Sequence, residues 1–473
     1  MSLFSTARRA SMALLMVAGL LGACKSSGSD DPTPTPPAPP STPGTPTPTQ
    51  YGTPFTGVPN REDAVLYQVN MRAFSQGGNF AGVTARLDSI RDLGVNVLYL
   101  MPIYPIGTDS RSVNSPYAVK DYRAVNPEFG SLTDLRTLVD GAHARGMAVM
   151  LDWVANHTSW DNAWITQHPD WYQKNAAGVI QPVSNNGTTY NDVAQLNFSN
   201  ADMRLEMISA LKSWVYTANV DGFRFDYADF QPNDFWKQAI DTLRNVKSHK
   251  LLLLAESSRS SNFASGFDYN FGFNFYGGIY QVYKNGAAAT AFDGLNTTEY
   301  NGATGTQQVV RYITNHDVNG SDGTPVELFG GKAGAMSAFV IASLYKGVPM
   351  IYNGQEAGMS QRIPFPFTGV KVRWGVNSDV KRAYKQLLAA RAGSAALRVG
   401  TPAGYSTTAV CAFTKTAGTE QAFVLVNTRN SPQTYAVPAA LANTTWTNAL
   451  QGGSVTVGTE VALPAYGYLV LKK

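Results

Sequence analysis

Three acidic side chains stand at the ends of apolar, strand-like runs of this 473-residue chain. One run, Gly222 to Asp226, ends in its acid, and a second, Leu251 to Ala255, is followed directly by Glu256. A third, Tyr312 to Asp317, repeats the pattern. A carboxylate that follows a buried strand is costly to desolvate unless it is paired or does chemistry. The sequence therefore offers Asp226, Glu256 and Asp317 as candidate catalytic groups.

The elements that must position these acids form a repeating pattern. Beyond Val58, short apolar runs alternate with helical stretches, which is typical of stacked βα units. Eight runs are candidate strands: Val65 to Asn70, Val95 to Pro102, Met147 to Val154, Asp221 to Tyr227, Leu251 to Ser257, Tyr269 to Phe275, Val309 to Asp317 and Val348 to Glu356. Eight such units predict an α/β fold, a closed (β/α)8 TIM barrel.

Polar side chains gather where four of these runs end, which is the end at which barrel enzymes carry their sites. They are Asp152, Asn156, His157, Arg224, Asp226, Glu256, His316 and Asp317.

We place the predicted barrel at residues 57–156 and 201–393. Two further segments accompany it. Residues 157–200 are rich in Trp, Asn, Gly and Gln and exceed what a connecting helix needs, so we expect a small domain inserted after strand 3. Residues 394–473 contain short β-type runs separated by Gly, Asn, Thr and Pro, which predict a C-terminal antiparallel β-sandwich.

The N-terminus has the features of a secretion leader. Arg8-Arg9 precede an apolar stretch that is too short to span a bilayer, and Leu21 to Cys24 resembles a bacterial lipobox. Cleavage there would remove residues 1–23 and leave a lipid on Cys24, anchoring the protein to a membrane. The alternative is an ordinary secretory signal with an incidental cysteine.

Residues 24–56 are a Pro/Thr-rich linker with almost nothing to bury, as expected of an extended tether. Lys25 after the cysteine, rather than aspartate, favours the outer membrane of a bacterial envelope.

Charge and cysteine content exclude some classes of protein. The net charge is +4, with no Lys/Arg run beyond the leader, so we expect no nucleic-acid partner. Cys24 and Cys411 are the only cysteines, which rules out a disulfide framework.

Four motifs in order resemble the α-amylase family of glycoside hydrolases, family 13. They are Asp152 to His157, Gly222 to Asp226, Glu256, and Asn315 to Asp317. The resemblance covers the chain from about Val65 to its end and implies the same order of barrel, insertion and C-terminal β-domain. It also implies an α-glucan substrate and no organic cofactor, and we expect a monomer.

The resemblance assigns roles to the acids. Asp226 would be the nucleophile and Glu256 the general acid and base of a retaining mechanism, which needs two carboxyls about 5–5.5 Å apart. Asp317 would hold sugar hydroxyls and stabilise the transition state. Arg224 would keep Asp226 ionised by charge pairing, and Asp152 would support the site by pairing with Arg224.

Other matched positions would bind substrate. His157 and His316 would donate to the sugar at the scission point, and Tyr117 would stack on its ring.

Several positions depart from the family pattern. Asp229-Phe230 stand where many starch-cleaving members have Lys-His, and Ser257 stands where tryptophan is common. Asn156 matches a usual calcium ligand, but Gln195 replaces an acid that often binds the same ion. Losing an anionic oxygen weakens a calcium site, so structural calcium at Asn156 is an open expectation.

The expected function is retaining endo-hydrolysis of α-1,4-glucosidic bonds in starch, glycogen or maltodextrins, as in α-amylases. The alternatives are a hydrolase or transglycosylase of short, branched or cyclic α-glucans, and a non-catalytic glucan-binding protein. The presence of Asp226, Glu256, Asp317 and Arg224 disfavours the last.

Overall fold

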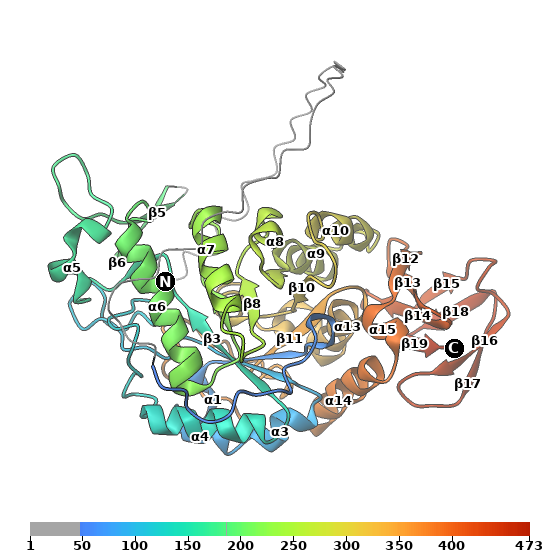
Figure 1. Cartoon of the computed structure of the whole chain (residues 1–473). Helices are drawn as coiled ribbons and strands as arrows, with labels where there is room; N and C mark the ends of the chain where they lie inside the picture. Colours follow the sequence, from blue (N-terminus) through green and yellow to red (C-terminus); the bar gives the residue numbers. More distant parts are fainter. Residues whose placement is uncertain (1–47, 186) are drawn as a thin grey trace, which may run out of the picture.

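A computed structural model describes residues 48–185 and 187–473. Figure 1 shows a large barrel body with the C-terminal strands set to one side of it. The predicted leader, Cys24 and the linker as far as residue 47 lie outside the described residues.

Eight parallel strands close the predicted barrel in the order β1-β11-β10-β9-β8-β7-β3-β2. Their bounds are β1 Leu66–Val69, β2 Val97–Leu100, β3 Ala148–Trp153, β7 Gly222–Phe225, β8 Leu252–Ala255, β9 Tyr269–Phe271, β10 Gln308–Arg311 and β11 Val348–Tyr352. Each lies inside or within a residue of its predicted run. Nearly every strand residue is buried, as expected of parallel strands covered by helices.

Helices connect the strands on the outside of the barrel (Figure 1). The longer ones are α4 Leu132–His143, α6 Ala201–Ala218, α7 Asn233–Arg244, α9 Phe273–Lys284, α10 Ala291–Glu299, α13 Gly331–Leu344 and α14 Ser378–Ala392. Shorter ones are η2 Arg61–Asp63, α1 Met71–Phe74, α2 Phe80–Thr84, α3 Leu87–Asp92, α8 Ser261–Ser265, α11 His316–Ser321, α12 Pro325–Leu328 and α15 Ala395–Val399.

Helix α4 illustrates why these sequences form helices. Ser131 and Asp134 form a reciprocal capping box at its start, which satisfies backbone N–H groups that a helix leaves unpaired. Its buried residues are the apolar positions at helical spacing, Leu135, Leu138, Val139 and Ala142.

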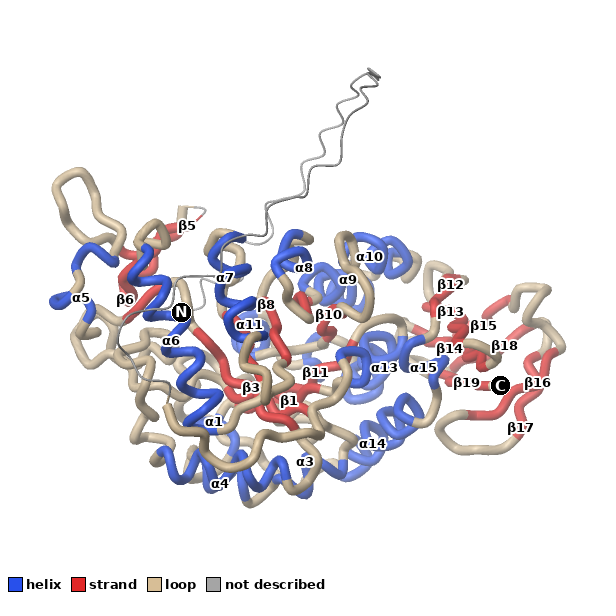
Figure 2. The backbone as a smooth tube through the Cα atoms, viewed as in Figure 1, coloured by secondary structure: helices blue, strands red, loops and turns tan. Residues whose placement is uncertain are grey.

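The chain between β3 and α6 forms a small separate sheet (Figure 2). Its three strands are β4 His157–Thr158, β6 Thr188–Gln195 and β5 Pro182–Asn185, with β6 in the middle. Helix α5, Trp164–Gln167, and the 3-10 turn η3, Pro169–Trp171, lie between β4 and β5 in the sequence.

The C-terminal antiparallel domain is confirmed. A six-stranded sheet, β12-β13-β14-β19-β16-β17, accompanies the pair β15-β18. The bounds are β12 Thr401–Gly404, β13 Val410–Ala417, β14 Glu420–Asn427, β15 Gln433–Ala436, β16 Thr444–Asn448, β17 Ser454–Val457, β18 Glu460–Leu463 and β19 Tyr468–Lys472. One apolar cluster joins Tyr435 and Leu463 of the pair to Phe423 and Trp446 of the larger sheet.

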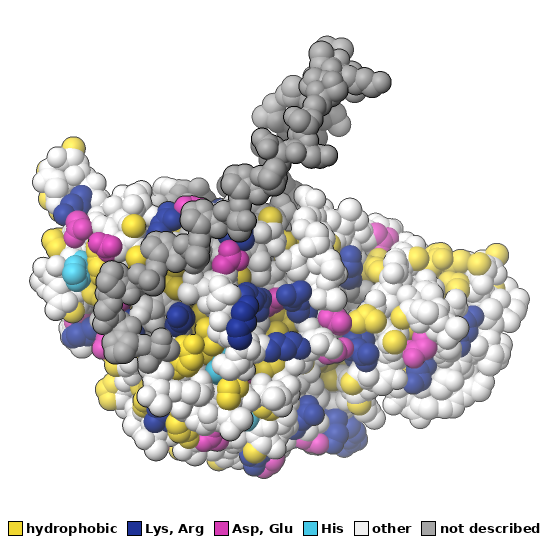
Figure 3. All heavy atoms as spheres, viewed as in Figure 1, with side chains coloured by type: hydrophobic (Ala, Val, Ile, Leu, Met, Phe, Trp, Pro, Cys, Tyr) yellow, Lys and Arg dark blue, Asp and Glu magenta, His cyan; other side chains and the backbone are white. Residues whose placement is uncertain are grey.

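The surface in Figure 3 carries Lys and Arg side chains interspersed with Asp and Glu. Within the described part of the chain, no helix combines the length and hydrophobicity that a membrane crossing requires.

Candidate active site

Two adjacent strands bring two of the predicted carboxylates to the same level of the barrel. Phe225 of β7 pairs with Ala255 of β8, so the next residues, Asp226 and Glu256, follow at matching heights. The backbone continues the ladder here, because Glu256 N donates to Phe225 O at 3.0 Å. Neighbouring strands lie about 4.8 Å apart. A close approach of β7 to β8 depends on Gly222, where a Cβ would lie 2.1 Å from Leu252 O.

Arg224 sits at the centre of the carboxylates with its side chain fully buried. Its Nη1 lies 2.6 Å from Asp152 Oδ1 and 2.9 Å from Asp226 Oδ1, and its Nη2 lies 2.9 Å from Glu256 Oε2. Both expected pairings of Arg224 are therefore present. A third, with Glu256, joins the guanidinium to the two carboxyls that stand on adjacent strands.

Burial and neighbouring charges have opposing effects on the carboxyl of Asp226. Burial raises the pKa of Asp226 well above its usual value, and the carboxylates of Glu256, Asp152 and Asp317 raise it further. Arg224 lowers this pKa but does not reverse the shift. Arg224 favours the ionised form of Asp226, as the sequence predicts, while burial and the neighbouring acids act against it. Such a group holds a proton to higher pH than an isolated carboxyl would.

Asp152 belongs to the same buried group. It pairs in register with Arg224, and burial raises the pKa of its carboxyl, against the lowering by Arg224 and His316. Tyr99 Oη donates to Asp152 Oδ2 at 2.7 Å. This carboxylate is turned into the barrel and holds Arg224 in place.

Tyr117 and His316 form a second cluster beside the carboxylate of Asp152. Gln68 Nε2 lies 2.8 Å from His316 Nδ1, and the other ring nitrogen of His316, Nε2, faces the site. That nitrogen lies 2.7 Å from Tyr117 Oη, and the same hydroxyl lies 3.2 Å from Asp152 Oδ2. The two rings are stacked with centroids 5.5 Å apart.

Asp317 is the second residue of helix α11, next to His316 of this cluster. Its Oδ1 lies 3.4 Å from His316 Nε2, and its side chain is 28% exposed. Asn315 Oδ1 caps the helix by accepting from Asp317 N at 3.0 Å. Asp317 is thus partly open to solvent, unlike Asp152 and Arg224.

His157 reaches the site from the inserted segment. Its side chain is buried and bonds the Tyr117 backbone, and burial lowers the pKa of its imidazole to about 4. The ring is therefore neutral near neutral pH. The structure thus brings together all the predicted catalytic and substrate-binding residues.

The side chains around Asn156 do not fit a calcium ion. Asn156 Nδ2 lies 3.4 Å from His157 Nδ1, and the residue opposite His157 in the β4–β6 ladder is the uncharged Gln195. Calcium prefers several anionic oxygens. Over residues 48–185 and 187–473, no group of three or more His, Cys, Asp or Glu side chains could hold a metal.

Sequence reasoning missed two residues of this site. Gln68 was detectable, because it is a polar residue inside the apolar run of β1. Tyr99 could not be singled out from the sequence, since a tyrosine in a buried strand is usually an ordinary core residue.

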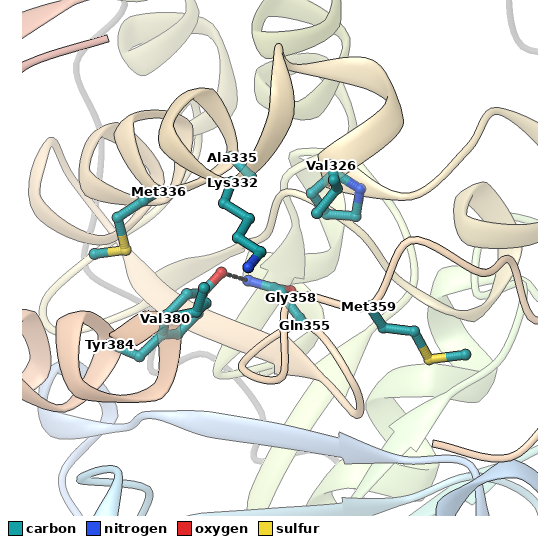
Figure 4. Close-up of a pocket in the computed structure, with 10 residues that line it drawn as sticks. Val326, Lys332, Ala335, Met336, Gln355, Gly358, Met359, Val380 and Tyr384 are labelled. Atoms are coloured by element: carbon teal, nitrogen blue, oxygen red, sulfur yellow. Dashed lines mark hydrogen bonds between the residues drawn. The ribbon is translucent and has the colours of Figure 1, made fainter. Parts of the chain in front are cut away.

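A small separate cavity of about 10 Å³ lies beside helices α12, α13 and α14. Figure 4 shows Met336, Met359 and Val380 around it and the hydrogen bond between Gln355 and Tyr384. No acid or histidine lines this cavity, so it offers no group for acid–base chemistry.

Comparison with known proteins identifies a matching family and several relatives of this chain. The family model described as "Alpha amylase, catalytic domain" matches residues 47–178 and 187–390. The α-amylase MalA of Haloarcula japonica is 26% identical over 64% of this chain, which spans only 45% of that relative. A cyclomaltodextrinase of Geobacillus thermopakistaniensis is 24% identical over 83% of this chain and 70% of its own length.

Among solved structures, an α-amylase from Lactobacillus plantarum superimposes with a TM-score of 0.77 at 29% identity. The match covers 87% of this chain and 99% of that one.

Proposed function

The chain belongs to the α-amylase family of glycoside hydrolases, and from that premise we propose that it hydrolyses α-glucosidic bonds in α-glucans with retention of configuration. The observation that supports this most is the position of Asp226 and Glu256. They follow adjacent strands at matching heights and share the Arg224 guanidinium. A retaining glycosidase needs two carboxyls held about 5–5.5 Å apart, and neighbouring strand ends provide that spacing.

Each acid has a role in this mechanism. Asp226 attacks the anomeric carbon, while Glu256 gives a proton to the departing glycosidic oxygen. A covalent glycosyl-enzyme results. Glu256 then takes a proton from water, which hydrolyses the intermediate with the original configuration. Asp317, the most exposed of the three acids, is placed to hold sugar hydroxyls.

The electrostatics of the site suit this cycle. A retaining cycle needs a proton on the general acid and an ionised nucleophile when the substrate is bound. Arg224 Nη1, 2.9 Å from Asp226 Oδ1, favours the ionised nucleophile. Tyr117, His316 and the neutral His157 contribute hydrogen-bonding groups around the sugar.

The substrate we favour is an α-1,4-glucan such as starch, glycogen or a maltodextrin, cut internally as by α-amylases. A second candidate is a short, branched or cyclic α-glucan. The cyclomaltodextrinase relative supports it, as do Asp229-Phe230 and Ser257 where starch-cleaving members differ.

We also propose that Cys24 carries a lipid that holds the protein on a bacterial envelope, with the outer membrane favoured. The described end of the predicted linker packs on the barrel. Phe55 stacks on His143 at 4.3 Å, and Asn219 Nδ2 donates to Thr53 O at 2.8 Å. His143 ends α4, which leads into β3, and Asn219 follows α6, which leads into β7. Both contacts therefore lie on the side of the barrel opposite the carboxylates.

A substrate panel tests the proposal. The mature chain with Cys24→Ser is incubated with soluble starch, maltotetraose, β-cyclodextrin and isomaltose, beside an Asp226→Asn version, and products are resolved by length. Mixed maltodextrins appearing early from starch support internal cleavage. Products from the short or cyclic substrates alone support the second candidate. No release from any substrate by the protein that retains Asp226 refutes hydrolysis.

A further inference from the structure

A glutamine inside the first barrel strand contacts a histidine of the site. Gln68 is the third residue of β1 and is fully buried, in register between Tyr99 of β2 and Tyr352 of β11. Its Nε2 lies 2.8 Å from His316 Nδ1, whereas its Oε1 is buried without a hydrogen-bond partner among the described residues. A buried amide oxygen left unpaired costs stability. Gln68 is therefore a poor choice for a position that only fills the core.

The direction of the next hydrogen bond follows from the single proton of a tyrosine hydroxyl. Tyr117 Oη donates to Asp152 Oδ2 at 3.2 Å and lies 2.7 Å from His316 Nε2. Because a hydroxyl has one hydrogen to donate, Tyr117 can only accept from the ring nitrogen. Asp317 Oδ1, 3.4 Å from the same nitrogen, is a second acceptor. The contacts of Nε2 thus favour an N–H at that position.

The other ring nitrogen then decides the charge of His316. With a proton on Nε2, the ring is neutral if Nδ1 accepts a hydrogen bond and positively charged if Nδ1 carries a proton as well. The carboxylates of Asp152 and Asp317 favour the charged ring, although Arg224 pairs with Asp152 and offsets part of this attraction. Gln68 favours the neutral ring, because its amide nitrogen faces Nδ1. Burial of the ring, which is 3% exposed, favours the same form.

We infer that Gln68 is a positioning residue that keeps the His316 ring neutral, with its proton on Nε2. Its amide begins a chain of hydrogen bonds that runs in one direction, through the ring and the Tyr117 hydroxyl to Asp152. The chain ends on the carboxylate that holds Arg224 at 2.6 Å. Hydrogen bonds aligned in this way strengthen one another in a buried site.

The consequence for the reaction rests on the proposed function. A charged His316 ring would compete with Arg224 for the carboxylate of Asp152. Arg224 is the cation that contacts both Asp226 and Glu256, so its position matters for both acids. A neutral ring leaves the pair of Asp152 and Arg224 undisturbed and still presents an N–H donor to the sugar.

Nitrogen-15 NMR of the histidine rings tests the inference without any substrate. The chain contains five histidines, and the spectrum of His316→Asn identifies the ring in question. In the parent protein we expect a protonated Nε2 and an unprotonated Nδ1 between about pH 5 and pH 8. In Gln68→Met, which keeps the side-chain length but has no donor, the ring should take up a second proton within that range. A parent ring that is charged throughout, a proton on Nδ1 alone, or a ring unchanged in Gln68→Met would overturn the inference.

Kinetics on maltotetraose test the consequence for activity. Gln68→Met should lower kcat/KM about tenfold, the worth of one hydrogen bond, and should add an acidic limb to the pH profile where His316 gains its charge. Gln355→Met is the matched control, because it removes another buried glutamine amide, bonded to Tyr384 at 2.9 Å beside the small separate cavity, and it should change neither.

A fall in kcat/KM that is equal at every pH would mean that Gln68 has only a structural role, and would overturn its assignment as a positioning residue. If the parent protein releases no sugar from any substrate while the NMR result holds, the proposed function fails and the neutral state of His316 stands.

Discussion

Replacing Asp226 by asparagine should make the folded protein increasingly more stable than the parent as the pH rises. The carboxyl of Asp226 is buried with Asp152, Glu256 and Asp317 near it, and its pKa lies well above the usual 3.8. At acidic pH it is protonated in both the folded and unfolded chains. The neutral amide is then a near-isosteric substitute, so the two proteins should unfold at similar denaturant concentrations.

The sign follows from proton binding. Between the unfolded and the folded pKa of Asp226, the folded chain binds more protons than the unfolded chain, so the parent loses stability as the pH rises. The loss is about 1.4 kcal/mol for each pH unit by which the folded pKa exceeds the unfolded one. Asp226→Asn has no such group. The difference between the proteins should therefore grow at that rate and level off above the folded pKa.

Urea unfolding followed by tryptophan fluorescence, at half-unit steps from pH 4.5 to 8, measures this difference, and the comparison cancels most other titrating groups. A difference that does not change with pH would refute the reasoning. A slope of opposite sign would show that the Arg224 ion pair outweighs burial and holds Asp226 ionised, as the sequence alone suggested.

Further outcomes follow from other contacts. Tyr117→Phe removes a hydroxyl 2.7 Å from His316 and 3.2 Å from Asp152, and kinetics should show kcat/KM on a maltodextrin about tenfold lower with thermal unfolding little changed. Burial raises the pKa of Glu356 from 4.5 to about 7. The folded protein therefore loses stability as the pH rises from about 4.5 to about 7, because the unfolded chain ionises this carboxyl first. Glu356→Gln, which still accepts from Tyr67, should gain about 3 kcal/mol relative to the parent between pH 4 and pH 8, measured by urea unfolding. Because the groups around Asn156 do not fit calcium, excess EGTA should leave the thermal midpoint and activity unchanged; a fall restored by Ca²⁺ would contradict this.

Much of the barrel could be predicted from the sequence because its strands are buried on both sides. Such strands appear as continuous apolar runs, and even the weakly marked sixth run contains β9, Tyr269–Phe271. The acids after β7, β8 and β10 were visible because a charge at the end of an apolar run is conspicuous.

The remaining features depend on contacts between residues far apart in the chain. The hydrogen bond from Asn185 to Tyr227 joins the inserted sheet to the barrel, and nothing near either residue indicates it. The pKa of Asp226 reflects burial and three acids from other segments of the chain as well as the adjacent Arg224, and the sequence near Asp226 shows only the arginine. Calcium was left open for a similar reason, since the sequence does not show which oxygens face Asn156.

The identity of the nucleophile is tested most directly by trapping the glycosyl-enzyme. In Glu256→Gln, α-maltosyl fluoride can still react, because fluoride leaves without a proton from the acid, whereas the second step lacks its base. Mass spectrometry of the intact variant should then show one added maltosyl group, and peptide mapping should place it on Asp226. An adduct on another residue, or none while fluoride is released, would contradict the proposed mechanism.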